Sequence, residues 1–195
     1  VRACSPDQAP LMTSTLDSAV EALVPTPTAC FQPRRFSDFA TVGEALEYAA
    51  AGHRGLNFHD PRGKLVRAYP YSELQQDAVQ TAYRLIAAGI KTGDRVALIA
   101  ETGAEFAALF FGTIYAGAWP VPLPLPTSFG GRDSYVGQLI VQLKSCDPVM
   151  LFYPPEIAAM AQDAAKAENV APMDWHEFAA REAVEAPLPE QKSEE

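Results

Sequence analysis

The sequence predicts an α/β fold: a mostly parallel sheet with helices on both faces, preceded by an N-terminal β-hairpin. Three short apolar runs bounded by turn residues have the length of buried strands, and helical patterns alternate with them. Such alternation implies right-handed crossovers between parallel neighbours. The predicted strands are residues 95–100, 118–123 and 149–153. The predicted helices between and after them are residues 104–116, 134–145 and 156–168, with a further short helix at 174–183.

Three parts are expected along the chain. Residues 1–40 contain scattered prolines and no sustained periodicity, which indicates an irregular arm with a short helix near residues 16–23. Residues 41–185 form the α/β domain, and residues 186–195 form an acidic linker or tail. The domain opens with a helix, because Thr41 and Glu44 have capping-box spacing and Gly52 can close it.

A hairpin and a long helix come next. Residues 55–59 and 65–69 flank the sequence Asp60-Pro-Arg-Gly63, in which Asp, Pro and Gly occupy positions favoured in a type I turn. Ser72 then has the spacing of an N-cap for an amphipathic helix that ends at Gly89.

The segment from residue 104 to residue 126 is the most apolar of the chain. No charged residue lies between Glu105 and Arg132, a length that could span a bilayer. Alternating prolines such as Pro120 and Pro122 prevent a helix over its second half. A buried helix followed by a strand therefore explains the segment better, and the missing N–H groups place that strand at a sheet edge.

The composition excludes several classes of protein. A net charge of -9 without a basic cluster argues against nucleic-acid binding. The three cysteines are far apart and no histidine pair has ligand spacing, so neither a disulfide framework nor a metal site is expected. This cysteine usage fits a reducing cytoplasm, and no targeting signal is visible.

Four places offer conceivable chemistry, each with a plainer structural interpretation. Residues 126–133 form a Gly-rich loop before a helix but lack the lysine and spacing of a phosphate loop, which favours a connector. Residues 101–104 stand where a dinucleotide fingerprint would be, with one glycine and an acidic residue. Residues 144–146 suit a helix end and residues 174–177 a helix start. We therefore assign no catalytic, cofactor-binding or metal-ligating residue.

Several short phrases follow one another in a specific order over residues 41–153: Tyr71-Ser-Glu-Leu74, Gly93-Asp-Arg-Val-Ala-Leu98, Phe110-Phe-Gly112, Tyr115-Ala-Gly-Ala118 and Val121-Pro122. Their order and spacing resemble the N-terminal portion of the adenylate-forming (AMP-binding) superfamily, which includes fatty-acyl-AMP ligases and acyl-CoA synthetases. The sequence Tyr-Ala-Gly with prolines directly after it resembles the fatty-acyl-AMP ligases more than the acyl-CoA synthetases. The phrases are scaffold motifs, so the resemblance transfers no catalytic residue.

The resemblance implies a two-step reaction for the intact parent. A fatty acid and ATP, with Mg²⁺, give acyl-AMP and pyrophosphate, and the acyl group then passes to CoA or to the phosphopantetheine of an acyl carrier protein. The family's phosphate loop, adenine segment, ribose-binding Asp and late Lys have no counterpart in these 195 residues. We therefore expect an N-terminal fragment, inactive alone and without bound cofactor, whose partner is the remainder of the same enzyme.

Two other interpretations stay open at this point. A standalone, non-catalytic α/β binding module could keep the same scaffold without the chemistry. An unrelated Rossmann domain would bind NAD or FAD, which the single glycine of residues 101–104 disfavours.

Overall fold

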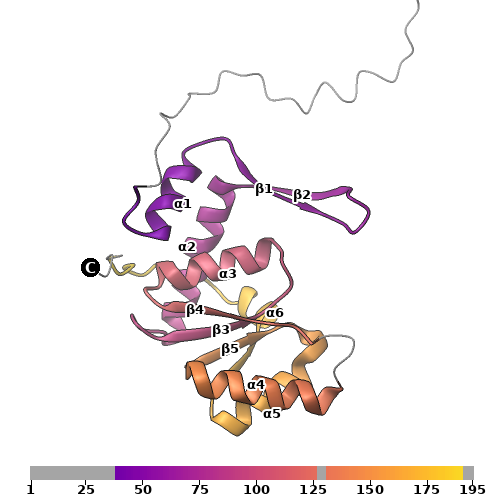
Figure 1. Cartoon of the computed structure of the whole chain (residues 1–195). Helices are drawn as coiled ribbons and strands as arrows, with labels where there is room; N and C mark the ends of the chain where they lie inside the picture. Colours follow the sequence, from indigo (N-terminus) through magenta and orange to yellow (C-terminus); the bar gives the residue numbers. More distant parts are fainter. Residues whose placement is uncertain (1–37, 127–130, 191–195) are drawn as a thin grey trace, which may run out of the picture. The chain divides into compact units, whose positions relative to one another are not determined.

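Four parallel strands in the order β4-β3-β5-β6 form the central sheet, and helices cover both of its faces (Figure 1). The structure, a computed structural model, describes residues 38–126 and 131–190, all within the unit Gln32–Glu195. This arrangement confirms the predicted fold class. The strands are β3 (Arg95–Ile99), β4 (Trp119–Leu123), β5 (Met150–Tyr153) and β6 (Ala171–Asp174). The helices are α1 (Val42–Ala50), α2 (Tyr71–Ala87), α3 (Ala104–Tyr115), α4 (Arg132–Cys146), the 3₁₀ turn η2 (Pro155–Ile157), α5 (Ala158–Glu168) and α6 (Trp175–Ala179).

Alternate residues of β3 enter two separate apolar cores. Val96 and Leu98 pack in the core that contains residues of α2 and α3, whereas Ala97 and Ile99 join residues of α4 and α5. All four side chains are at most 1% exposed. Successive strand residues face opposite sides of a sheet, so an uninterrupted apolar run is what a strand covered on both faces requires.

β4 lies at an edge of the sheet, as its prolines predict. The N–H of Trp119 donates to the carbonyl oxygen of Asp94 at 2.7 Å, and the parallel register with β3 continues from there. In a parallel ladder alternate residues bond to the same neighbour, so Pro120 and Pro122 fall between the residues that donate to β3. Their missing N–H groups therefore remove no bond from the ladder.

The opposite edge strand, β6, is not predicted from the sequence. Residues 171–174 pair in parallel with β5, although Ala, Pro and Asp are depleted in strands. Pairing with an existing sheet outweighs that weak local preference, and the proline is tolerated because β6 is an edge. The helix predicted at residues 174–183 is shorter, since α6 ends at Ala179. Asp174 caps it, accepting from the N–H of His176 at 2.8 Å.

The predicted hairpin is confirmed as an antiparallel pair of β1 (Gly55–His59) and β2 (Leu65–Pro70). Asp60 organises the turn, because its Oδ1 accepts from the N–H groups of Arg62 and Lys64, each at 2.9 Å. Gly63 has a φ of 80°, which glycine adopts without strain.

The start of α2 differs from the prediction. The helix begins at Tyr71, directly after β2, with Pro70 as the N-cap residue and no side-chain cap. The predicted Ser72 cap is therefore wrong, and Ser72 lies in the first turn. The predicted end is confirmed, because Gly89, with a φ of 94°, follows the last turn of the helix.

Thr41 caps α1 as predicted, its Oγ1 accepting from the N–H of Glu44 at 3.1 Å. The Glu44 carboxylate reaches one residue further back than a standard capping box, since it accepts from the N–H of Ala40 at 2.9 Å. Gly52 follows the Ala51 cap and donates its N–H to the last turn of α1.

α2 and α3 approach each other closely at Gly112. A Cβ at this position would lie 2.5 Å from Thr81 Cγ2 and 2.9 Å from the Ala78 carbonyl oxygen, so only glycine fits the contact. Within residues 38–126 and 131–190, no helix combines the length and apolar character needed to cross a membrane. The apolar segment is a helix followed by a strand, as predicted.

Some predictions fall outside the described residues. These are the arm up to residue 37, with its helix near residues 16–23, residues 127–130 of the Gly-rich loop, and residues 191–195.

Candidate functional site

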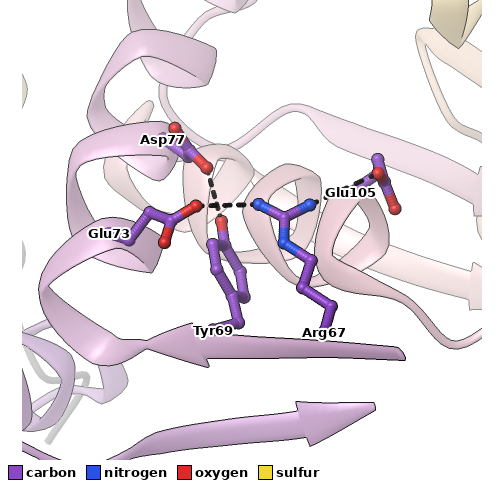
Figure 2. Close-up of polar contacts among 5 residues, drawn as sticks. All are labelled: Arg67, Tyr69, Glu73, Asp77 and Glu105. Atoms are coloured by element: carbon purple, nitrogen blue, oxygen red, sulfur yellow. Dashed lines mark hydrogen bonds and ion pairs between the residues drawn. The ribbon is translucent and has the colours of Figure 1, made fainter. Parts of the chain in front are cut away.

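Figure 2 shows a cluster of five polar side chains from β2, α2 and α3. All of them except Glu73 line a cavity of about 290 Å³. Arg67 and Tyr69 extend from β2 toward acidic residues of the two helices. The hairpin lies close to the helices because β2 leads directly into α2, with Pro70 as the N-cap residue. The cluster consists of Arg67, Tyr69, Glu73, Asp77 and Glu105.

Tyr69 is the buried member of the cluster, with 1% of its surface exposed. Its hydroxyl donates to Asp77 Oδ2 at 2.7 Å. Burial, and then this bond to Asp77, raise the pKa of Tyr69 far above its ordinary value. The phenol therefore stays protonated at physiological pH and acts as a hydrogen-bond donor, not as a base.

Arg67 joins both acidic helix positions. Its guanidinium donates to Glu73 at 2.9 Å, lies 3.6 Å from Glu105 and stacks over the Tyr69 ring at 4.5 Å from the centroid. The hydrogen bond to Glu73 is the largest influence that raises the pKa of Arg67. The cation is thus already neutralised by carboxylates of α2 and α3.

Two further polar residues of the lining, Arg84 and Thr81, are also paired with protein. Arg84 donates from Nε to the Arg181 carbonyl oxygen at 2.7 Å, and Thr81 donates to the Asp77 carbonyl oxygen at 2.7 Å. Apolar residues such as Leu109 and Phe178 complete the lining. A closed set of mutual partners supports a structural junction, which holds the hairpin on the helices, rather than a catalytic centre.

The residues around this cavity do not fit ATP or Mg²⁺. Among them there is no group of three His, Cys, Asp or Glu side chains that could hold a metal ion. The two arginines beside the cavity are committed to Glu73, Glu105 and the Arg181 carbonyl, and the cavity's own acidic residues would repel a phosphate.

The described residues at the end of the Gly-rich loop and in the turn after β3 have structural roles of their own. Of residues 126–133, Arg132 begins α4 and is ion-paired with Asp163 of α5. In residues 101–104, Gly103 is the N-cap of α3 with a φ of -162°, an extended conformation that any residue adopts. Neither Gly103 nor Gly131 has a positive φ that would require glycine.

Residues 144–146 and 174–177 have the structural roles at helix ends that the sequence predicts. Lys144 lies in the last turn of α4, where a cation complements the helix dipole. Burial raises the pKa of the neighbouring Cys146 thiol, which disfavours the reactive thiolate. Trp175 packs against the larger core beside the Asp174 cap.

Sequence reasoning did not find the polar cluster. Arg67 and Glu105 are separated by a whole helix in the sequence, and no local pattern connects them. Arg67 stands two residues before the buried Tyr69 in β2, and this spacing does not indicate which acidic residues Arg67 meets.

Comparisons with known proteins agree on one family. The sequence model of the AMP-binding enzymes matches residues 49–194. A Caulobacter vibrioides protein named "Putative acyl-CoA synthetase" is 46% identical over 132 residues, which cover 68% of this chain and 23% of that protein. This chain therefore spans about a quarter of that relative's length.

Solved structures give the same result for the fold. A structure from studies of fatty acyl-adenylate ligases of E. coli and L. pneumophila has a TM-score of 0.76 and 37% identity, covering 80% of this chain and 28% of that one. The McyG A-PCP structure with phenylalanyl-adenylate has a TM-score of 0.67 and 21% identity, covering 82% of this chain and 29% of that one. The latter likeness concerns the fold alone.

Proposed function

Because the chain belongs to the AMP-binding enzyme family, we propose that it is the N-terminal portion of an ATP-dependent ligase that activates fatty acids as acyl-adenylates. The observation that carries the fatty-acid assignment is the combined likeness to an acyl-CoA synthetase relative at 46% identity and to a fatty acyl-adenylate ligase structure at 37% identity. The sequence Tyr115-Ala-Gly117, with prolines after it, supports the same assignment to fatty-acid activation.

In this proposal the described residues supply the scaffold and not the reacting groups. The sheet packs against helices through two apolar cores, while the polar groups of the hairpin cluster are paired among themselves. Residues 41–185 act as the N-terminal subdomain, and residues 186–195 as an acidic linker or tail. ATP, Mg²⁺, the fatty acid and the acceptor thiol of CoA or a carrier protein bind largely to other residues of the parent. The scattered cysteines support a cytoplasmic location.

The test is fatty-acid-dependent exchange of pyrophosphate into ATP. The purified 195-residue chain should show no exchange above background with saturated fatty acids of different lengths. A chimera should regain it: residues 49–190 of this chain replace the matching segment of the Caulobacter relative, whose own exchange is measured in parallel.

Each arm has an outcome against the proposal. Exchange by the isolated chain would show that it holds a complete site. A chimera that folds, with the circular dichroism and unfolding midpoint of its parent, but lacks exchange while the parent has it, would contradict the scaffold role. A matched chimera that also carries Arg62→Glu, a change in the exposed hairpin turn, should retain the activity of the first chimera.

A further inference from the structure

The hairpin of β1 and β2 is a sheet of only two strands (Figure 1). Such a hairpin is marginally stable in water by itself, and sheets gain stability from further strands or from a helix packed against them. One face of this hairpin is packed, because Leu56, Phe58 and Tyr69 lie against the larger core. Tyr69 is buried, but Leu56 and Phe58 are only half-buried. The strand that carries the half-buried residues, β1, therefore has apolar surface left to cover.

The pairing of β1 with β2 determines which backbone groups are used inside the hairpin. At its open end, the N–H of Tyr71 donates to the carbonyl oxygen of Arg54 at 2.9 Å. Hydrogen-bonded pairs alternate with non-bonded pairs in an antiparallel ladder. The next bonded pair is therefore Leu56 with Tyr69, and Phe58 lies in the one after it.

The outer edge of β1 presents a continuous row of backbone groups. Gly55, Asn57 and His59 alternate with the bonded residues, so their N–H and carbonyl groups point away from β2. Each of these residues is exposed, and their N–H groups donate to no acceptor among residues 38–126 and 131–190. No proline and no Lys, Arg, Asp or Glu interrupts residues 55–59. The edge is thus able to form a full ladder with another strand.

The other sheet edges in the described part of the chain are interrupted by proline. On β4 the outward positions are those of Pro120 and Pro122. On β6 the N–H of Ala171 donates to the carbonyl oxygen that precedes β5, which leaves Pro172 at the outward position. The outer row of β2 ends at Pro70. Proline at an edge removes the donors that strand addition needs, and β1 lacks this protection.

We propose that the outer edge of β1 binds an extended strand from the remainder of the parent enzyme. The inference rests on the proposed function, because it takes the chain as one portion of a longer ligase. The chain covers 23% of the acyl-CoA synthetase relative and 28% of the fatty acyl-adenylate ligase structure, so most of a parent of that length lies elsewhere. A strand of the same polypeptide has a high effective concentration, which favours it over a second copy of the chain.

The two faces of the hairpin specify the chemistry of the incoming strand. Its residues beside Leu56 and Phe58 lie on the face that packs against the helices, so they should be apolar. Its residues beside Asn57 and His59 lie on the exposed face, so they should be polar. The positions that donate to β1 cannot be proline. The expected occupant is a short strand in which apolar and polar residues alternate.

Amide hydrogen exchange tests the proposal at the outward N–H groups of β1. Mass spectrometry with residue-level fragmentation compares the isolated 195-residue chain with the chimera that carries the remainder of the Caulobacter relative. We expect Gly55, Asn57 and His59 to exchange at least about tenfold more slowly in the chimera, because the added strand is present only there. The N–H of Ala68, which faces outward on β2, should exchange equally in both and is the internal control.

A matched pair of proline variants separates the two edges of the hairpin. Asn57 and Ala68 lie opposite each other in a non-bonded pair, so proline at either position removes no hydrogen bond from within the hairpin. In the chimera, N57P should abolish the slow exchange of Gly55 and His59, whereas A68P should preserve it. The isolated chains carrying N57P and A68P should have similar unfolding midpoints. Slow exchange that persists in the N57P chimera would contradict the proposal.

The remaining outcomes identify other occupants and separate this inference from the proposed function. Equal exchange of the β1 groups in the chimera and the isolated chain would mean that no strand binds there. Slow exchange already in the isolated chain would also overturn the proposal, and its dependence on concentration would distinguish a second copy from a segment of the same chain. A chimera that exchanges pyrophosphate but leaves β1 unprotected would refute this inference alone. A protected chimera without pyrophosphate exchange would support the strand and contradict the proposed function.

Discussion

The sheet and the hairpin are held in place by different kinds of interaction. In β3, Val96 to Ile99 are at most 1% exposed and touch apolar residues on both faces. The hairpin alternates between exposed and half-buried residues, with Val66 at 69% exposure, and is joined to α2 and α3 through the Tyr69 and Arg67 contacts. The sheet is fixed by many non-directional contacts, whereas the hairpin combines apolar contacts of Leu56, Phe58 and Tyr69 with a few specific polar ones.

The difference matters because the two kinds of contact have unequal magnitudes. Full burial of a large aliphatic side chain contributes about 1.5–3 kcal/mol, whereas an exposed ion pair contributes about 0–1 kcal/mol. Substitutions in the sheet should therefore act on the unfolding of the whole domain, and substitutions in the hairpin cluster should have smaller effects.

The largest expected effect comes from the central strand. Leu98→Ala leaves a cavity at a fully buried position and should lower the free energy of unfolding by about 2–5 kcal/mol. Urea denaturation monitored by circular dichroism measures the loss. Val66→Ala in the hairpin is the matched control and should change stability by less than about 0.5 kcal/mol. Equal losses in the two variants would erase the distinction between the regions.

An intermediate effect is expected at the contact between α2 and α3, the helices that the hairpin joins. Gly112→Ala places a Cβ 2.5 Å from Thr81 Cγ2 and should cost about 1–3 kcal/mol, because α3 and α2 must separate slightly. Gly137→Ala, in α4, is the opposite case. No atom lies within 4 Å of the new Cβ, so the higher helix propensity of alanine should stabilise by up to about 1 kcal/mol. Thermal unfolding of both variants should show a loss of stability for Gly112→Ala and a gain for Gly137→Ala. An unchanged stability of Gly112→Ala would show that α2 and α3 can move apart without cost.

The smallest effect is expected in the hairpin cluster. Tyr69→Phe removes the donor to Asp77 and should lower stability by about 1 kcal/mol at neutral pH. The pKa of Tyr69 is raised in the folded state, so the native chain keeps its proton where the unfolded chain has lost it. Stability from this group is complete below the unfolded pKa of about 10 and declines as the pH rises above it.

The variant should therefore approach, and then exceed, the wild type in stability as the pH is raised from 9 to 11. Denaturation curves across this range at constant ionic strength check the crossing. A gap that stays constant with pH would mean that Tyr69 ionises as readily in the folded chain as in the unfolded one.

The sequence was informative wherever a local pattern carried the structural cause. The buried strand β3, the edge position of β4 and the Thr41 cap could be predicted from the sequence. The apolar run, the prolines and the cap spacing that cause them each lie within a few neighbouring residues. β6 was missed because its neighbour β5, not its own composition, makes it a strand. The Ser72 cap failed because β2 leads straight into α2.

The polar cluster was beyond reach for a related reason. The partners Arg67 and Glu105 belong to different elements and meet only in the folded chain. Burial of apolar residues leaves a periodic trace in a sequence, while a hydrogen bond between distant side chains leaves none. The family could be recognised from its short scaffold motifs, because these too are local patterns in the sequence.

The prolines of β4 also decide what this edge of the sheet can meet. Pro120 and Pro122 turn their carbonyl groups outward without an accompanying N–H, and the carbonyl oxygen of Pro124 already accepts from the Tyr135 hydroxyl at 2.9 Å. An incoming strand would find acceptors but no donors, and could not form a full ladder. Pairing of two copies of the chain along β4 is therefore disfavoured by the backbone itself, without a contribution from surface charge.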